Sequence, residues 1–288
     1  MIRITEVENI DGKKRIALLD TSSVSFLQRL SEREIAAGEI LKDYDLILIP
    51  CWVLEELNDA VGRAAYVQRL IDVGYPIFSI SEEVYSDLAK KEEGNLYQIV
   101  LASTYQIGRI KSYLRRFVEK NDILDMEAYR IWINRLYEEW PIPGEVLSSG
   151  RIKKKNAGEV SITILAEVVS WYYPETEGLT IYSQDSDTYY SQDSDTYEFQ
   201  RKAEERLRMV FTSRVPIPVS YKSNDAILCQ LYREEKISLD KIRECRKDTR
   251  RITYSKQRQD QSVILVTEIV EHESFLELVQ DNTVQIIF

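Results

Sequence analysis

The sequence is poor in the residues that usually bind transition metals or form disulfides. Its 288 residues include one histidine, His272, and three cysteines, Cys51, Cys229 and Cys245, which lie far apart and form no CxxC pair. This composition argues against a zinc site, a disulfide framework and a Ser-His-Asp triad. It favours reduced thiols, and we expect a cytoplasmic protein. The GxGxxG and GxxxxGK[ST] patterns of phosphate-binding loops are also absent from the sequence.

Long apolar runs and an excess of positive charge are missing as well. The longest apolar run, LILIPCWVL, is far too short to cross a membrane, and the first fifteen residues contain no apolar stretch typical of a signal peptide. The net charge of −10 does not suit a protein that coats nucleic acid non-specifically. It suits a protein that gathers carboxylates, or one that binds nucleic acid through a local basic patch. Hydrophobic residues make up 44%, enough for a sizeable core.

Short apolar segments alternate with helical stretches along the chain. We predict strands at residues 15–20, 45–50, 75–80, 179–183, 214–221 and 262–270. This alternation indicates an α/β fold, with three α/β/α layers and a mostly parallel central sheet. Residues 81–140, rich in Leu, Tyr, Lys and Glu, predict a helical insert of two or three helices. We expect one domain over residues 1–240, followed by a basic segment and a C-terminal strand/helix extension over 241–288.

Acidic residues fall at one edge of the predicted sheet, where the carboxyl ends of parallel strands meet. They either end a strand, directly follow one, or lie in the first turns of a helix. The residues at these positions are Asp20, Glu55, Glu56, Glu159, Asp185 and Asp187. Each alone fits an ordinary helix cap. Together they would repel one another unless a cation lay between them, and oxygen ligands alone favour Mg²⁺ or Mn²⁺.

Four segments resemble the motifs of the PIN-domain nucleases, in the order of that family. They are LLDTSSVSFL, IPCWVLEEL, NAGEVSITILAE and IYSQDSD. In the second motif the acidic residue directly precedes Leu, which selects Glu56 over Glu55. The resemblance covers about residues 15–235. It implies a three-layer α/β/α fold and metal-dependent cleavage of phosphodiester bonds, usually in RNA. Two departures are Asn156, where the family often has Asp, and the long gap between Glu56 and Glu159.

The resemblance assigns roles to the acidic residues and their neighbours. Asp20, Glu159 and Asp185 are expected to bind one or two Mg²⁺ or Mn²⁺ ions, with Glu56 and Asp187 completing the shell or holding waters. The hydroxyls of Thr21 or Ser22 either position a water or a phosphate oxygen, or cap the helix. The implied protein is an endoribonuclease of the toxin or defence type, restrained by a protein partner.

The fourth motif occurs twice in tandem. The octapeptide YSQDSDTY occupies residues 182–189 and again residues 190–197. The first copy directly follows the predicted strand, so we expect Asp185 and Asp187 to be the ligands. Asp193 and Asp195 are expected to lie in an extended loop.

Two basic segments are candidates for contacts with phosphates. One lies just before Glu159, and its members are Arg151, Lys153, Lys154 and Lys155. The other, residues 241–258, has eight basic residues against two acidic ones, and it suits either a nucleic-acid track or an acidic partner. RNA is favoured over DNA as the substrate, and an oligomer is compatible with the sequence.

A second interpretation uses the same residues without catalysis. The chain would be an α/β protein-binding module with a degenerate PIN-like site, whose acidic residues are helix caps. Its helical insert, or its apolar tail TVQIIF acting as an edge strand, would then bind another protein.

Overall fold

Five parallel strands form a central sheet with the order β3-β2-β1-β4-β5. They are seen in a computed structural model that describes residues 2–119, 128–144, 146, 150–183, 196–246 and 249–287. The strands are β1 (Arg15–Leu19), β2 (Leu46–Pro50), β3 (Ile77–Ile80), β4 (Gly178–Tyr182) and β5 (Val219–Lys222). The predicted α/β fold with a mostly parallel sheet is confirmed. Almost every residue of β1, β2 and β4 is buried, as expected for strands covered by helices on both faces.

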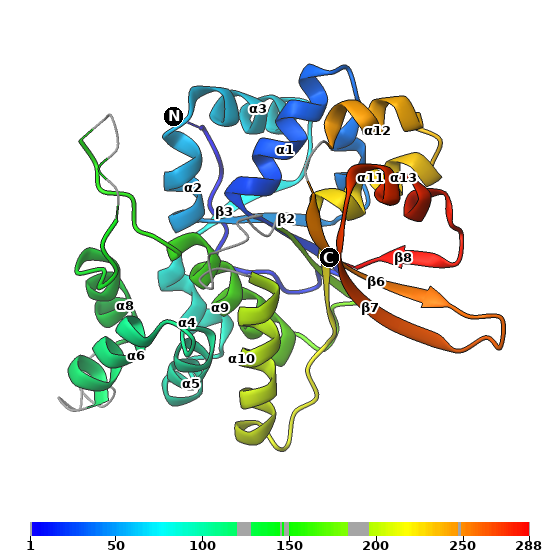
Figure 1. Cartoon of the computed structure of the whole chain (residues 1–288). Helices are drawn as coiled ribbons and strands as arrows, with labels where there is room; N and C mark the ends of the chain where they lie inside the picture. The colour runs from blue at the N-terminus through cyan, green and yellow to red at the C-terminus, as the bar shows by residue number, and fades with distance from the viewer. Residues whose placement is uncertain are drawn as a thin grey trace.

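Helices cover both faces of this sheet and complete the three layers (Figure 1). On one side lie α1 (Thr21–Glu32) and α3 (Val61–Asp72), and on the other α9 (Ala157–Tyr172) and α10 (Thr196–Val210). Helix α2 (Cys51–Asn58) follows β2 directly and packs against both α3 and α9. In α9 nearly every residue is buried, which explains its almost continuous apolar sequence.

The predicted insert is helical, but it is divided into more segments than the two or three helices that we expected. It contains η2 (Glu82–Val84), α4 (Tyr85–Leu88), α5 (Glu93–Ser103), α6 (Gly108–Leu114), η3 (Arg115–Glu119) and α8 (Tyr129–Glu138). Helix α5 packs on both α9 and α10. The buried side chains of the insert therefore belong to the same hydrophobic cluster as those of the central sheet.

The C-terminal part contains a second, antiparallel sheet with the order β7-β6-β8. Its elements are α11 (Asn224–Arg233), α12 (Leu239–Cys245), β6 (Arg250–Gln257), β7 (Val263–Val270), α13 (His272–Gln280) and β8 (Val284–Ile286). The strand predicted at 214–221 is wrong at its start, because β5 begins only at Val219. Pro216 and Pro218 have no N–H to give to a sheet. No helix among the described residues is both long and apolar enough to cross a membrane.

The basic segment 241–258 is largely used within the protein. Its residues form α12 and β6, neither of which the sequence had indicated. Arg246 is fully buried, donates to both carboxylate oxygens of Asp225 at 3.1 and 3.2 Å, and reaches the carbonyl of Val270. Arg250 lies 3.7 Å from Asp225, and Lys256 lies 3.1 Å from Asp281. These ion pairs account for much of the positive charge that had suggested a nucleic-acid track.

Candidate functional site

Asp20 follows β1 at the edge of the sheet where the parallel strands end. Its carboxylate accepts hydrogen bonds from the Ser23 N–H at 2.6 Å, the Ser22 hydroxyl at 2.8 Å and the Ser183 hydroxyl at 2.5 Å. It is therefore the N-cap of α1, as one interpretation of the sequence expected. Burial raises the pKa of Asp20, and the hydrogen bonds from Ser183, Ser23 and Ser22 oppose that rise.

Glu56 and Glu159 lie beside Asp20, close enough for the three charges to interact. Burial raises the pKa of Glu56, and the charge of Asp20 adds to the rise. Burial likewise raises the pKa of Glu159 to about 7, and the charges of Glu56 and Asp20 contribute in that order. The Thr21 hydroxyl donates to Glu56 Oε2 at 3.1 Å. We call Asp20, Glu56 and Glu159 the carboxylate cluster.

The start of α9 brings Glu159 to this cluster. Asn156, the N-cap of α9, has a left-handed backbone with φ of 64°, a conformation that asparagine tolerates better than most residues. A Cβ at Gly158 would lie 3.2 Å from Val53 and 3.7 Å from Glu56 Oε1. Glycine thus allows the first turn of α9 to approach α2 closely, and this approach places Glu159 next to Glu56.

The two hydroxyls assigned to substrate both act on carboxylates. Thr21 donates to Glu56, and Ser22 donates to both oxygens of Asp20 at 2.9 and 2.8 Å. In this arrangement they hold the carboxylates in place, while the backbone N–H of Ser23 donates the capping hydrogen bond to Asp20 Oδ1.

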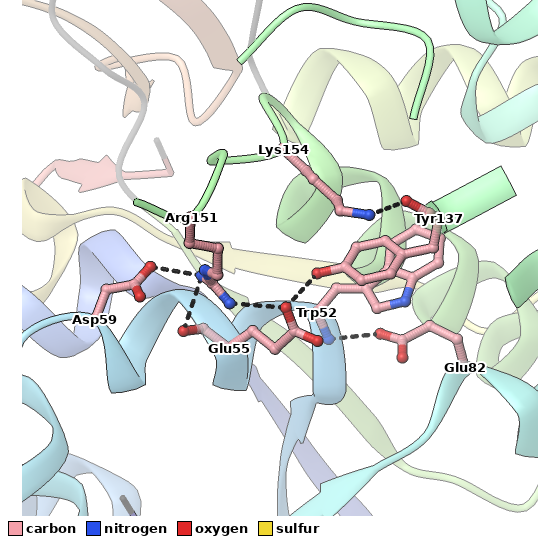
Figure 2. A network of polar contacts seen from close by, with 7 residues as sticks. All are labelled: Trp52, Glu55, Asp59, Glu82, Tyr137, Arg151 and Lys154. Atoms are coloured by element: carbon pink, nitrogen blue, oxygen red, sulfur yellow. Dashed lines mark hydrogen bonds and ion pairs between the residues drawn. The ribbon is translucent and has the colours of Figure 1, made fainter. Parts of the chain in front are cut away.

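The basic segment before α9 is attached to the rest of the protein at three points, and Figure 2 shows those of Arg151 and Lys154. Arg151 donates to Glu55 Oε2 at 2.8 Å and to Asp59 Oδ2 at 2.5 Å, both on or next to α2. Lys154 donates to the carbonyl of Tyr137, and its Nζ lies 3.8 Å from the centre of that ring. The carbonyl of Lys155 accepts from Trp140 Nε1 at 2.9 Å. Arg151 and Lys154 are therefore occupied by protein contacts.

Trp52, Tyr137 and Trp140 form an aromatic cluster, and two of these contacts, those of Lys154 and Lys155, are made to it. Trp52 of α2 stacks on Tyr137 of α8 with ring centres 4.6 Å apart, and Trp140 meets Trp52 edge-on at 5.5 Å. The Tyr137 hydroxyl donates to Glu55 at 2.7 Å, so Glu55 joins α8 to Arg151 (Figure 2). The buried Glu82 accepts from the Trp52 N–H at 3.0 Å and holds the start of α2. The insert thus supports the segment that leads into the site.

Lys153 lies between the attached residues and is exposed. Its charge lowers the pKa of both Glu56 and Glu159, against the larger effect of burial. Lys153 therefore has an electrostatic effect on the carboxylate cluster.

Asp185, Asp187, Asp193 and Asp195 lie outside the described residues, as does the rest of the duplicated motif over 184–195. In the described part of the chain, no group of three or more His, Cys, Asp or Glu side chains is placed so that it could hold a metal ion as it stands. The donor chemistry of the carboxylate cluster nevertheless fits a hard divalent cation, because its oxygens are partly desolvated and repel one another.

Ser183, Gly158 and the Trp52–Tyr137 stack were not expected from the sequence. Ser183 directly follows β4 within the motif IYSQDSD, so its position in that motif was the available signal. Gly158 precedes the acidic residue of the third motif. Tyr137 had no such signal, because its partners Glu55 and Arg151 are 82 residues before it and 14 residues after it in a chain with many tyrosines.

A scan against models of protein families, and searches of curated proteins and of solved structures, found no match to this chain. The site itself therefore carries the argument about function.

Proposed function

We propose that the protein is a nuclease that cleaves phosphodiester bonds with the help of Mg²⁺ or Mn²⁺, and that RNA is its substrate. The observation that carries this proposal is the carboxylate cluster. Three acidic side chains, from the N-cap of α1 and from α2 and α9, converge at the carboxyl edge of a parallel sheet. Burial raises the pKa of all three, and repulsion by the other carboxylates adds to the rise at Glu56 and Glu159. A divalent cation would relieve both penalties.

Each residue has a distinct part in the proposal. Asp20 and Glu159 would hold the ion with Asp185 and Asp187, and Glu56 would complete its shell or hold waters. When bound, the ion would lower the pKa of a coordinated water and neutralise charge on the phosphate. Ser22, Ser183 and Thr21 keep the carboxylates oriented through their hydrogen bonds. Lys153, exposed beside Glu56 and Glu159, would attract the phosphate chain.

The remaining parts of the proposal follow from the resemblance to PIN-domain nucleases. The protein would act as an endonuclease of the toxin or defence type, and it would be located in the cytoplasm. A protein partner would restrain it, because an unrestrained ribonuclease harms its host.

One observation favours a second candidate, a non-catalytic binding module. Asp20 accepts the hydrogen bond expected of an N-cap, and two hydroxyls also donate to it, so a structural role would account for its contacts. This candidate predicts no response to divalent ions.

The deciding experiment compares the wild type, Asp20→Asn and a matched control, Asp45→Asn. Asparagine is also a good N-cap, so Asp20→Asn should preserve α1 while weakening cation binding. Asp45 accepts backbone hydrogen bonds from Lys14 and Arg15 at the opposite edge of the sheet. Each protein is incubated with transfer RNA, structured RNA, single-stranded DNA and duplex DNA, in Mn²⁺, Mg²⁺ or EDTA. Its melting temperature is measured with and without Mn²⁺.

The proposal expects RNA cleavage that requires the metal, falls by at least about 100-fold in Asp20→Asn and persists in Asp45→Asn. Mn²⁺ should raise the melting temperature of the wild type and of the control, and it should raise that of Asp20→Asn less. If the wild type shows neither cleavage nor a Mn²⁺ shift in melting temperature, the nuclease proposal is wrong and the binding module is favoured. If it shows a Mn²⁺ shift but cleaves no substrate, the cation site is supported and the nuclease activity is contradicted.

A further inference from the structure

The insert carries a concentration of positive charge that the proposed site does not use. Residues 104–118 contain four basic residues and no acidic one, in a chain with a net charge of −10. The four are Arg109, Lys111, Arg115 and Arg116. They occupy the solvent side of α6 and η3, while Ile110, Leu114 and Val118 face the core.

Two cations from distant parts of the chain meet on this surface. Lys111 Nζ of α6 lies 3.7 Å from the centre of the Tyr105 ring, and Arg206 Cζ of α10 lies 3.0 Å from the same centre. Lys202, one turn earlier on α10, donates to Gln106 at 2.9 Å. The aromatic ring offsets part of the repulsion between Lys111 and Arg206, but it supplies no negative charge.

Acidic neighbours on α10 are already engaged. Glu204 pairs with Arg208 at 2.5 Å and Glu205 pairs with Arg201 at 2.7 Å, each within one turn of the helix. Across the described ranges, no carboxylate forms an ion pair with Lys111, Arg115 or Arg206. Their charge is therefore available to an anion from outside.

The packing of α10 relates this surface to the carboxylate cluster. Gln200 of α10 donates to Glu167 of α9 at 3.0 Å, and Glu167 lies eight residues after Glu159 on the same helix. Glu167 lies about two helical turns from Glu159 along α9, α10 packs beside α9, and Arg206 lies nearly two turns beyond Gln200 along α10. These steps give a separation on the order of 20 Å. At ~3.4 Å per stacked nucleotide, this distance corresponds to about six nucleotides.

We propose that Lys111, Arg115 and Arg206 form a second phosphate-binding subsite, which holds the part of an RNA chain that extends beyond the carboxylate cluster. This inference rests on the proposed function, and it adds that the protein would bind long RNA chains more tightly than very short ones. An RNA long enough to span both places gains phosphate contacts, while a very short one reaches only the carboxylate cluster and Lys153. Helix α6 of the insert and helix α10 would then both contact the substrate.

The test measures RNA binding without cleavage. Dissociation constants are determined in EDTA for a 24-nucleotide and a 4-nucleotide single-stranded RNA at several KCl concentrations. The subsite variant is Lys111→Gln/Arg115→Gln/Arg206→Gln. The control variant, Arg130→Gln/Arg201→Gln/Arg208→Gln, removes the same charge from three exposed arginines that are each paired with an acid.

The subsite variant should bind the 24-nucleotide RNA at least about tenfold more weakly, and the slope of log K against log salt should shrink by about 2 for three lost phosphate contacts. Binding of the 4-nucleotide RNA should not change, and the control should match the wild type on both. Equal effects of the two variants, or an equal loss on both RNAs, would overturn the subsite. If only the subsite is wrong, Asp20-dependent cleavage persists; if the proposed function is wrong, that cleavage is absent as well.

Discussion

Glu167 of α9 is fully buried and faces α10. Its oxygens accept from Trp171 Nε1 at 2.8 Å and from Gln200 Nε2 at 3.0 Å. Burial raises the pKa of Glu167 to about 8, and the charge of Glu204 adds to the rise. The residue belongs to the third motif quoted above, yet its sequence position gave no sign of this role, since burial depends on α10, more than 30 residues later.

This shift predicts how stability depends on pH. The folded protein binds the proton of Glu167 more tightly than the unfolded chain does. The stabilisation is therefore complete below the ordinary pKa of glutamate and is lost as the pH rises through about 8. Glu167→Gln is neutral throughout, and the amide of Gln200 can turn to accept from it. Its melting temperature should gain several degrees on the wild type between about pH 5 and pH 9.

Glu82 and Glu159 shift in the same direction, so the difference between variant and wild type is the informative quantity, and not the wild-type curve alone. Glu244→Gln, which also removes one carboxylate, at an exposed residue paired with Lys241, serves as the control. A Glu167→Gln curve parallel to that of the wild type would show that Glu167 titrates normally.

At the scale of elements, the segment before α9 is ordered by its attachments to α2 and α8. Arg151 links Glu55 and Asp59, and Glu55 in turn accepts from Tyr137. Arg151→Ala should release the segment while leaving its lysines as protease sites. Endoproteinase Lys-C should then cut after Lys153 several-fold faster than in the wild type, because local opening exposes the backbone.

Arg130→Ala is the matched control, because Arg130 also forms one surface ion pair, at 2.9 Å from Asp87. Digestion of this control should match that of the wild type. Equal rates for all three proteins would mean that the aromatic contacts of Lys154 and Trp140 hold the segment without Arg151.

The elements that the sequence predicted well are those with a strong local pattern. Strands β1, β2, β3 and β4 are short apolar runs at the positions that the sequence predicted. Strand β6 was missed because its residues are mostly polar or basic, and its pairing with β7 and β8 stabilises it. Local sequence does not contain that information.

At the scale of the whole molecule, three carboxylates of the candidate site were foreseen and their surroundings were not. The rule that parallel strands end at one edge indicated Asp20 and the pair Glu55 and Glu56, the first turn of a helix added Glu159, and the resemblance to PIN-domain nucleases selected Glu56. The ion pairs of Arg151 and the exposure of Lys153 depend on how the insert folds against α2, which no motif specifies.

The second sheet exposes an apolar edge strand. Val263 and Leu265 of β7 are 66% and 64% exposed, and Ile269 is 56% exposed on the same face. Charged residues usually protect such edges from pairing with other chains. Leu265→Lys should therefore reduce concentration-dependent association, as measured by static light scattering, with little change in melting temperature.

Val215→Lys provides the control for this change. Val215 is 84% exposed and lies outside the strands, so the substitution alters net charge equally without touching the edge. A similar effect of both variants would assign the change to net charge instead of β7.

The pairing of β1 with β4 has a consequence for synthesis of the protein. β1 is complete by Leu19, but its neighbour β4 begins at Gly178, so a ribosome must add about 160 residues before the two can meet. Until then Asp20 lacks the Ser183 hydroxyl, and α9 lacks its contacts with β4 and α10. A nascent chain would thus carry its acidic residues without a formed site. The proposed activity would begin only when most of the protein has left the ribosome.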